Sequence, residues 1–181
     1  TVADIAGLVE FAHRYGARVF ATVTTILHDS ELGAARKLID QLYDAGVDAL
    51  IVQDATLLHQ VDLLAGLPSD GYVLVNTTRT FAELGLAQFV AAHRPERLMT
   101  VPATEIALAH LGRPLPNAVL LGGFAALTGQ VALAGVQEAV IERFPGAIGE
   151  ANAAAAGEAH REVLARVAGQ RWREEEHAIA D

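Results

Sequence analysis

The sequence predicts an α/β fold in which a parallel sheet of about four strands lies between helices, followed by a helical C-terminal part. Three observations favour this class. Short apolar runs typical of buried strands alternate with amphipathic helical segments. The connections between these runs are long enough for the crossovers that parallel neighbours require. After Pro102 the strand-like runs stop and only helical patterns follow. We therefore expect a three-layer, doubly wound sheet of the Rossmann or flavodoxin-like class.

The N-terminal part is predicted to form a helix, a strand and a second helix. The segment "ADIAGLVEFAHRYG" carries apolar residues on one helical stripe and ends at Gly16, which suits a helix C-terminus. The β-branched run "RVFATVTTI" then predicts a strand over residues 19–26. A second amphipathic segment, "SELGAARKLIDQLYDAG", ends at Gly46.

A helical pattern follows each of the remaining predicted strands, which cover residues 49–52, 72–75 and 98–101. Asp54 comes directly after the first of these strands and can cap the helix that follows. The sequence "TFAE", Thr80 to Glu83, is a capping box in which a hydroxyl and a carboxylate can each satisfy a free backbone N–H group. Helix is therefore expected to follow strand throughout this part.

The apolar run "AVLLGGFAALTGQVALAGV", residues 118–136, has no charge over a length that could span a bilayer. Its glycines, with Thr128 and Gln130 in the middle, favour instead a buried helix pair in a soluble domain, and the glycine pairs would permit close helix packing. The polar tail, residues 165–181, is predicted to be a solvated helix end. Because no second core is required, we expect residues 1–181 to form a single α/β domain.

Composition excludes several classes of function. Of the 181 residues, 52% are hydrophobic and 19% are charged, as in an ordinary globular domain. The sequence has no cysteine, so it offers no disulfide, no thiol nucleophile and no thiolate ligand for zinc or an iron–sulfur cluster. The net charge of −9 is spread along the chain without a cluster of Lys and Arg, so nucleic acid is not an expected partner. No signal peptide is visible, and a cytoplasmic location is expected.

Polar residues follow each predicted strand, at the edge of the sheet where ligands bind in doubly wound folds. The loop "NTTRT", Asn76 to Thr80, is the strongest candidate because hydroxyls, an amide and a guanidinium at the opening of a helix can hold an anion. The residues that we predict to bind a cofactor there are Asn76, Thr77, Thr78, Arg79, Asp54 and Thr104. The same residue types also cap a strand-to-helix turn, and in that case Arg79 would only be solvated.

No catalytic or metal site is predicted. His28 and Asp29 could act as a general base and its partner, but N-capping by Asp29 or Ser30 explains the same residues more simply. The histidines on predicted helices have no second ligand at suitable spacing, and they are His59, His93, His110 and His160. The sequence also lacks a G-x-S-x-G motif, a P-loop and a full dinucleotide-binding fingerprint.

From Asp48 to about Leu164 the chain resembles the gamma subunit, or gamma domain, of the 2-oxoacid:ferredoxin oxidoreductases, which include pyruvate:ferredoxin oxidoreductase. The similarity rests on "DALIVQDATLLHQVDLLAGL", "DGYVLVNTTRTFAELGL", "VPATEIALAHLGRPLPNAVLLGGFAALTG" and "ERFPGAIGEANAAAA". Members of that family open with a glycine-rich turn resembling GxGGQG, and no such turn occurs before Asp48.

Residues 1–58 instead resemble a βαβ piece of the collagenase-like peptidase family, whose catalytic part is similar to a TIM-type barrel. This likeness rests on "EFAHRYGARVFATVTTILHDSELGAARKLIDQLYDAGVDALIVQDATLL". The two resemblances overlap at "VDALIVQDATLL", which predicts a seam over residues 46–58 between a barrel-like segment, 1–47, and a gamma-like segment, 48–164. We therefore interpret the chain as a recombined or engineered chimera, with a divergent natural gamma-like protein as the alternative.

The resemblances lead to three functional hypotheses. The first is a folded scaffold, or gamma-like domain, without enzymatic activity of its own. The second is an accessory gamma subunit of a 2-oxoacid:acceptor oxidoreductase that assembles with alpha and beta subunits. The third is a remnant peptidase-like activity, which is disfavoured because one βα segment lacks the other strand ends that build a barrel site.

The gamma resemblance also implies which cofactors the chain would meet. It implies a contribution to the coenzyme A side of the active site, which we carry over to Asn76, Thr77, Thr78 and Arg79. It assigns thiamine diphosphate to other subunits, and the absence of cysteine leaves the iron–sulfur clusters of the pyruvate reaction to other chains as well. Self-association through an exposed strand edge is the other contact we expect.

Overall fold

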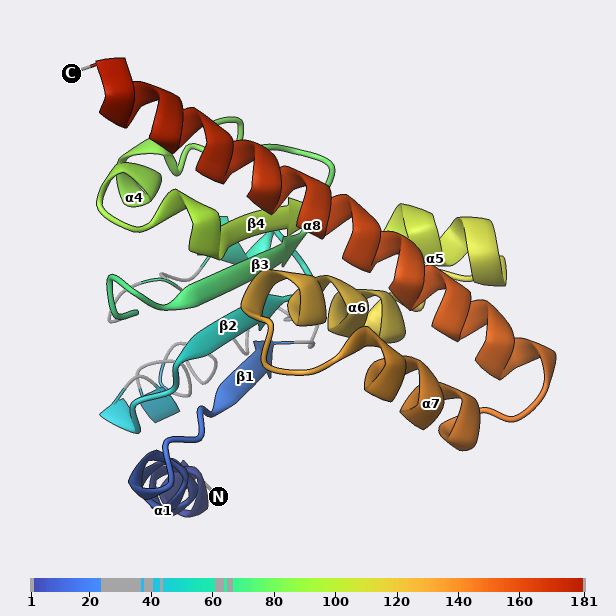
Figure 1. The fold of residues 1–181 in the computed structure, drawn as a ribbon. Coiled ribbons are helices and arrows are strands. Elements are labelled where there is room, and N and C mark those ends of the chain that lie inside the picture. Colours follow the sequence, from blue (N-terminus) through green and yellow to red (C-terminus); the bar gives the residue numbers. More distant parts are fainter. Residues whose placement is uncertain are drawn as a thin grey trace. The chain divides into compact units, whose positions relative to one another are not determined.

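In the computed structural model, four strands form one sheet in chain order, β1-β2-β3-β4 (Figure 1). The strands are β1 (Phe20–Val23), β2 (Ala49–Val52), β3 (Tyr72–Asn76) and β4 (Leu98–Val101). β1 and β2 run parallel, with Phe20 beside Ala49 and Val23 beside Val52. β2 and β4 are buried along their whole length, as continuous apolar runs favour. The predicted α/β class, with a four-stranded parallel sheet and a helical C-terminal part, is confirmed.

The structure describes residues 2–23, 37, 41–42, 44–60, 64 and 67–180. They fall into two compact units, residues 1–73 (unit 1) and residues 74–181 (unit 2). The helix predicted to end at Gly46 lies mostly outside the described residues. Residues 24–26 of the strand predicted over residues 19–26 and the candidate pair His28 and Asp29 also lie outside them.

Unit 1 opens with helix α1 (Val2–Arg14), followed along the chain by β1 and β2. The buried side chains Val9, Leu42 and Val47 form its local core. Gly16 has a φ of 68°, so the glycine predicted to end the first helix does so in the left-handed conformation that glycine adopts without strain. A short helix, α3 (Leu57–Gln60), follows β2.

One carboxylate ties the parts of unit 1 together. The Asp48 Oδ2 atom accepts a hydrogen bond of 2.9 Å from the Val19 backbone N–H and lies 2.9 Å from His13 Nε2. The Asp48 N–H in turn donates to the Val19 carbonyl at 2.8 Å. This one side chain therefore links the C-terminal turn of α1 to the residue before β1, a contact that satisfies backbone groups which the strand ladder leaves free.

Unit 2 contains β4 and most of the helices. These are α4 (Ala87–Ala91), the 3₁₀ helix η2 (Pro95–Arg97), α5 (Ala103–Leu111), α6 (Asn117–Thr128), α7 (Leu133–Arg143) and α8 (Ala147–Ala180). The predicted solvated tail therefore continues α8 to Ala180. The backbone of α5 and that of α6 both end at left-handed glycines, Gly112 and Gly129, each with a φ of 64°.

The apolar run over residues 118–136 forms α6 and the first part of α7, separated at Gly129. Nine of the twelve residues of α6 are buried, whereas α7 buries only Val136 and Val140. The two helices predicted from the sequence are therefore present, but only α6 is largely buried, so the expectation of a buried pair is confirmed for α6 and wrong for α7. Among the described residues, none of the helices combines the length and the apolar character needed to cross a membrane.

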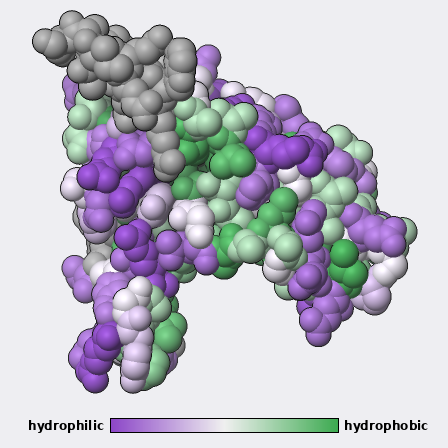
Figure 2. Space-filling view, in the orientation of Figure 1, coloured by the Kyte–Doolittle hydropathy of each residue, from purple (hydrophilic) through white to green (hydrophobic). Residues whose placement is uncertain are grey.

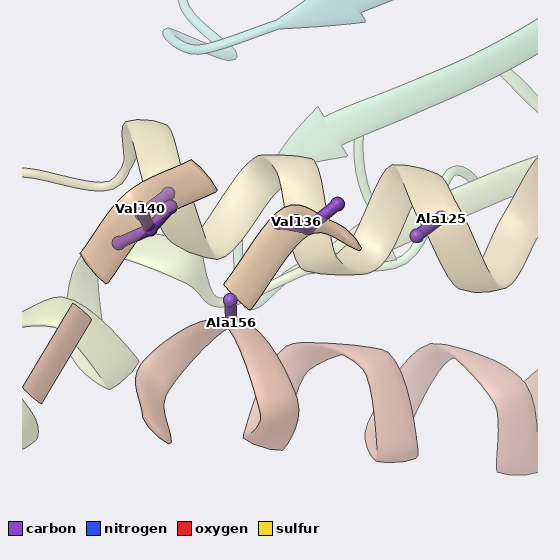
Figure 3. Packing of buried hydrophobic residues seen from close by; sticks show 5 residues of the cluster. Ala125, Val136, Val140 and Ala156 are labelled. Carbon is purple, nitrogen blue, oxygen red and sulfur yellow. The ribbon is translucent and has the colours of Figure 1, made fainter. Parts of the chain in front are cut away.

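Two small residues allow α6 and α8 to pack closely. A Cβ atom added at Gly122 would lie 2.0 Å from the carbonyl oxygen of Ala156, so only glycine fits at that crossing. The buried side chains of the adjoining cluster come from α6, α7 and α8, and they are Ala118, Ala125, Val136, Val140 and Ala156 (Figure 3). The predicted role of the glycine pair in close helix packing is confirmed.

The open side of β4 is partly covered by a side chain of α8. Neighbouring residues of a strand point their backbone groups to opposite sides. The Val101 carbonyl accepts a hydrogen bond of 3.0 Å from the Thr77 N–H, on the β3 side. The Thr100 carbonyl therefore points away from β3, where Arg166 Nη1 donates to it at 3.0 Å. A charged side chain on the edge of a sheet discourages pairing with another strand.

Candidate functional site

The carboxyl end of β3 is fixed to the start of α5 by one amide side chain. Asn76 Oδ1 accepts a hydrogen bond of 3.1 Å from the Thr104 N–H, and Asn76 Nδ2 donates to Thr104 Oγ1 at 2.8 Å. Both residues are half-buried. The Thr104 N–H is one of the free donors at a helix N-terminus, so the asparagine acts as a cap supplied from another element. The predicted neighbourhood of Asn76 and Thr104 is therefore present.

Thr77, Thr78 and Arg79 form a turn that is held by a hydrogen bond between its own residues. The Thr77 N–H continues the strand pairing through its bond to Val101. The Thr77 hydroxyl accepts a hydrogen bond of 3.1 Å from the Arg79 N–H. Thr78 and Arg79 are exposed. This is the local hydroxyl-to-backbone pattern typical of threonine in turns, which the sequence offered as the alternative to ligand binding.

The predicted capping box is formed. Glu83 Oε2 accepts hydrogen bonds from the Thr80 N–H at 2.7 Å and from Thr80 Oγ1 at 2.8 Å. The Glu83 N–H donates back to Thr80 Oγ1 at 3.3 Å. The box closes only a single turn, however, because α4 begins later, at Ala87, after Gly85 with a φ of 76°. The helix predicted to start directly at this box is thus displaced along the chain.

The carboxylate of Glu83 is held in its charged form. The backbone N–H of Thr80 lowers the pKa of Glu83 most, the Thr80 hydroxyl lowers it further, and the nearby Arg79 guanidinium adds a smaller effect in the same direction. The Arg79 guanidinium also donates to the Glu83 backbone carbonyl. Part of the positive charge of Arg79 is therefore balanced by Glu83, which weakens the case for a strong anion site.

The groups left for a ligand are the Thr78 hydroxyl and the remaining guanidinium donors of Arg79. Guanidinium offers five N–H donors, and of these the structure shows one interaction, with Glu83. An incoming phosphate could bind these donors without breaking the Asn76–Thr104 clamp. The exposed donors of this turn are of the kind that bind anions.

Asp54 lies in unit 1 and caps its own turn. Asp54 Oδ1 accepts hydrogen bonds from the Thr56 N–H at 2.9 Å and from Thr56 Oγ1 at 2.7 Å, directly before α3. This confirms the capping role predicted for Asp54. Its predicted participation in a cofactor site with the residues of unit 2 stays a prediction.

Two histidine–carboxylate pairs were missed by sequence reasoning. His110 Nε2 lies 2.6 Å from Glu158 Oε2 and joins α5 to α8, and His13 pairs with Asp48 in unit 1. The partners are 48 and 35 residues apart, and a pattern based on helical spacing cannot connect such distant positions. Within the described part of the chain, no group of three or more His, Cys, Asp or Glu side chains is arranged to hold a metal ion.

A cavity of about 490 Å³ beside the capping box was not predicted either. Its lining includes Thr80, Phe81 and Met99, and Arg166 of α8 forms part of the wall. Arg166 is already engaged there with Thr100 and Glu162. The size is that of a small-molecule site, but polar groups of the wall already have partners within the chain, Thr80 with Glu83 and Arg166 with Thr100 and Glu162.

Comparison with known proteins gives one family. The model of the pyruvate ferredoxin/flavodoxin oxidoreductase family matches residues 11–162. The common gamma subunit of the pyruvate/ketoisovalerate oxidoreductases of Thermococcus kodakarensis is 44% identical over 68% of this chain and 64% of its own length. The crystal structure of a pyruvate oxidoreductase subunit from Thermotoga maritima superimposes with a TM-score of 0.52 at 31% identity, covering 64% of this chain and 62% of the other. The chain thus spans less than two thirds of the length of these relatives.

The same comparisons give no support for the interpretation as a chimera or for a segment from the collagenase-like peptidases. The family match begins at residue 11 and extends across the predicted seam at residues 46–58. A second similarity exists, to the 23S rRNA 5-hydroxycytidine C2501 synthase of Escherichia coli, at 47% identity over 49% of this chain but only 14% of that enzyme. The shares of the chain covered by this enzyme and by the gamma subunit together exceed the whole, so the two matched segments overlap.

Proposed function

Because the chain belongs to the pyruvate ferredoxin/flavodoxin oxidoreductase family, we propose that it acts as an accessory, gamma-like subunit of a 2-oxoacid:acceptor oxidoreductase. The observation that carries this proposal is the identity of 44% to a common gamma subunit over 68% of the chain. Its role is to assemble with partner subunits and to contribute to coenzyme A binding. The comparisons favour this accessory role over the scaffold that the sequence placed first.

The chemistry available in the chain agrees with an accessory role. No cysteine is present to hold an iron–sulfur cluster. The exposed turn after β3 offers hydrogen-bond donors that suit the positioning of an anionic group. Thiamine diphosphate and electron transfer therefore belong to partner subunits in this proposal.

Within the proposal, coenzyme A meets the turn formed by Thr77, Thr78 and Arg79. Arg79 and the Thr78 hydroxyl are exposed and would contact a phosphate directly. Asn76 and Thr104 would not contact the ligand but would position the turn, because their two mutual hydrogen bonds hold it against α5. The nearby Glu83 carboxylate opposes an anion, so we expect modest affinity from this chain alone.

The test is a thermal melt of the purified chain with and without millimolar coenzyme A. A ligand that binds only the folded state raises the unfolding midpoint, by roughly 3–6 °C when its concentration is ten times Kd. Arg79→Ala should abolish the rise. Arg113→Ala is the matched control, because Arg113 is an exposed arginine in the loop between α5 and α6, away from this turn.

A non-binding scaffold is the second candidate, and one observation favours it. The turn already uses its amide, one hydroxyl and its arginine in internal hydrogen bonds. A cooperative melt whose midpoint is the same with and without coenzyme A would support the scaffold and contradict the coenzyme part of the proposal. A rise that persists in Arg79→Ala would show binding at a different place.

A further inference from the structure

An apolar groove runs between α6 and α7 in unit 2. It encloses about 620 Å³, and Figure 2 shows hydrophobic side chains at the surface where Figure 1 places these two helices. Its large lining residues are Leu121, Phe124, Val131, Val136, Val140 and Phe144. Among all the residues that line it, only Asn117 and Arg143 carry polar side chains. With only these two polar side chains, the groove offers few groups that could orient a small polar ligand.

Large side chains of this groove are left open to solvent. Leu121 is 43% exposed, Val131 is 45% exposed and Phe144 is 43% exposed. Each would gain roughly 25 cal/mol for every Å² of apolar surface removed from water. A continuous exposed apolar surface of this kind is typical of a site where another protein docks.

Small exposed residues form part of the groove lining. Gly135 and Ala139 lie four residues apart on α7, Ala132 is the N-cap residue just before that helix, and all three line the groove. A Cβ atom added at Gly135 would meet nothing within 4 Å. The backbone of α7 is therefore accessible to close approach, which is the geometry that lets two helices pack at short distance.

Positive and negative side chains of α7 lie at different positions relative to the groove. Arg143 is the only charged residue in its lining, although the chain as a whole has a net charge of −9. The carboxylates of α7, Glu138 and Glu142, are exposed at positions that do not line it. The Arg143 guanidinium lies 5.4 Å from the centre of the Phe144 ring, and within the described residues it has no carboxylate partner.

From these features we infer that the groove is the docking site for an amphipathic helix of a partner subunit. The apolar face of that helix lies over the small residues of α7, and a carboxylate near one end pairs with Arg143. The inference rests on the proposed function, because it identifies where one of the partner subunits binds.

Gly135→Leu tests the inference, because it fills the groove and leaves the fold intact. A Cβ atom added at Gly135 meets nothing within 4 Å, so the new side chain can extend into the groove, and leucine favours a helix more than glycine does. Gly7→Leu is the matched control, since Gly7 is an exposed glycine of α1 whose added Cβ would also meet nothing within 4 Å. Arg143→Glu is the second variant, which reverses the charge at the groove.

The probe is the set of remaining subunits of the Thermococcus kodakarensis pyruvate oxidoreductase, co-expressed with a tagged copy of this chain. The tagged gamma subunit of that organism serves as the positive control. The chain and Gly7→Leu should retain the partner subunits alike, and Gly135→Leu should weaken their binding about tenfold or more. Arg143→Glu should weaken it several-fold and more strongly at low salt, as expected for a charge pair.

Two outcomes separate the inference from the proposed function. If the unmodified chain retains the subunits and both groove variants retain them equally, the docking site is wrong and the accessory role stands. If the positive control assembles and the chain does not, both are overturned. A self-association of the chain that Gly135→Leu abolishes, without loss of partner binding, would instead make the groove a contact between two copies.

Discussion

Asn76 shows how much of the candidate site is determined by a single residue. One amide supplies both the acceptor for the Thr104 N–H and the donor to the Thr104 hydroxyl, at 3.1 Å and 2.8 Å. The two groups lie in β3 and α5, so this pair holds the carboxyl end of the sheet against a helix N-terminus. A residue with only half of this capacity would leave one group unsatisfied.

Asn76→Ala should lower the free energy of unfolding by about 1–3 kcal/mol, because the half-buried Thr104 N–H loses its acceptor. Asn76→Asp should cost much less, since a carboxylate oxygen keeps that acceptor and the hydroxyl of Thr104 can turn to donate to the other oxygen. Urea unfolding of the two variants beside the unmodified chain measures the difference. Equal losses in both would show that the amide group as such, and not the acceptor, stabilises the turn.

Glu83 predicts a pH dependence with a definite sign. Its pKa in the folded state is lowered from 4.5, so the folded chain holds the carboxylate more firmly charged than the unfolded chain does. The stabilisation is then fully present above the unfolded pKa and is lost as the pH falls through the folded value. The difference in stability between the chain and Glu83→Gln should therefore be constant near neutral pH and shrink in acid below about pH 4.5. Unfolding midpoints measured from pH 3 to pH 7 check this, and a difference that grows in acid would contradict it.

At the scale of elements, the helices of unit 2 depend on two glycines in opposite ways. Gly122 lies where α6 crosses α8, and its absent side chain lets the helices touch at the Ala156 carbonyl. Gly135 lies on α7 in open space. Both are helical glycines with ordinary φ, so the same substitution separates the effect of packing from the effect of helix propensity.

Gly122→Ala should destabilise unit 2 by about 1–3 kcal/mol or more, because a Cβ atom cannot stay 2.0 Å from a backbone oxygen and the helices must move apart. Gly135→Ala should stabilise the chain by up to about 1 kcal/mol, as expected for replacing glycine in an exposed helix. Denaturant unfolding of the pair gives both numbers. Destabilisation by Gly135→Ala would show that α7 is packed more tightly than the structure has it.

Sequence patterns predicted the helices and strands well where the stabilising interactions are between residues close in the sequence. The strands at residues 49–52 and 98–101 have the predicted bounds. Glycine at Gly16 and the capping box at Thr80 form as expected. The predicted start of α4 was wrong, because the turn that follows the capping box passes through Gly85 in a left-handed conformation before the helix begins. That turn depends on how the chain enters the next helix, which the four residues of the box do not specify.

The whole molecule shows where sequence reasoning ends. Alternating strand and helix patterns predicted the fold class, but strand order is a long-range property, and the sequential order β1-β2-β3-β4 has no reversal among the four strands. A ligand crevice at a switch point in that order therefore cannot be assigned from these strands. The end of β3 is joined instead to the start of α5, the helix that follows β4, by a hydrogen-bonded pair, Asn76 with Thr104. The apolar groove of α6 and α7 could not be predicted from the sequence, because its exposure depends on which helix faces α8 leaves uncovered.

The two proposed surfaces use different residues of unit 2, and this leads to a prediction for the molecule as a whole. The coenzyme turn involves Thr78 and Arg79, whereas the docking groove involves Gly135 and Arg143, with no residue in common. Changes at sites without shared partners are usually additive. Gly135→Leu should therefore leave the rise in melting temperature with coenzyme A unchanged, and Arg79→Ala should retain partner subunits as the unmodified chain does.

Both measurements can be made on the same protein preparations. If Arg79→Ala also loses the partner subunits, the turn is itself part of the assembly surface and its arginine pairs with a partner carboxylate, so the coenzyme assignment would have to be withdrawn. If Gly135→Leu removes the coenzyme shift in the isolated chain, filling the groove must alter the turn through α6 or α5, which would mean that the helices transmit a change between the two surfaces. Independence of the two variants would instead establish that one unit carries two separate binding functions.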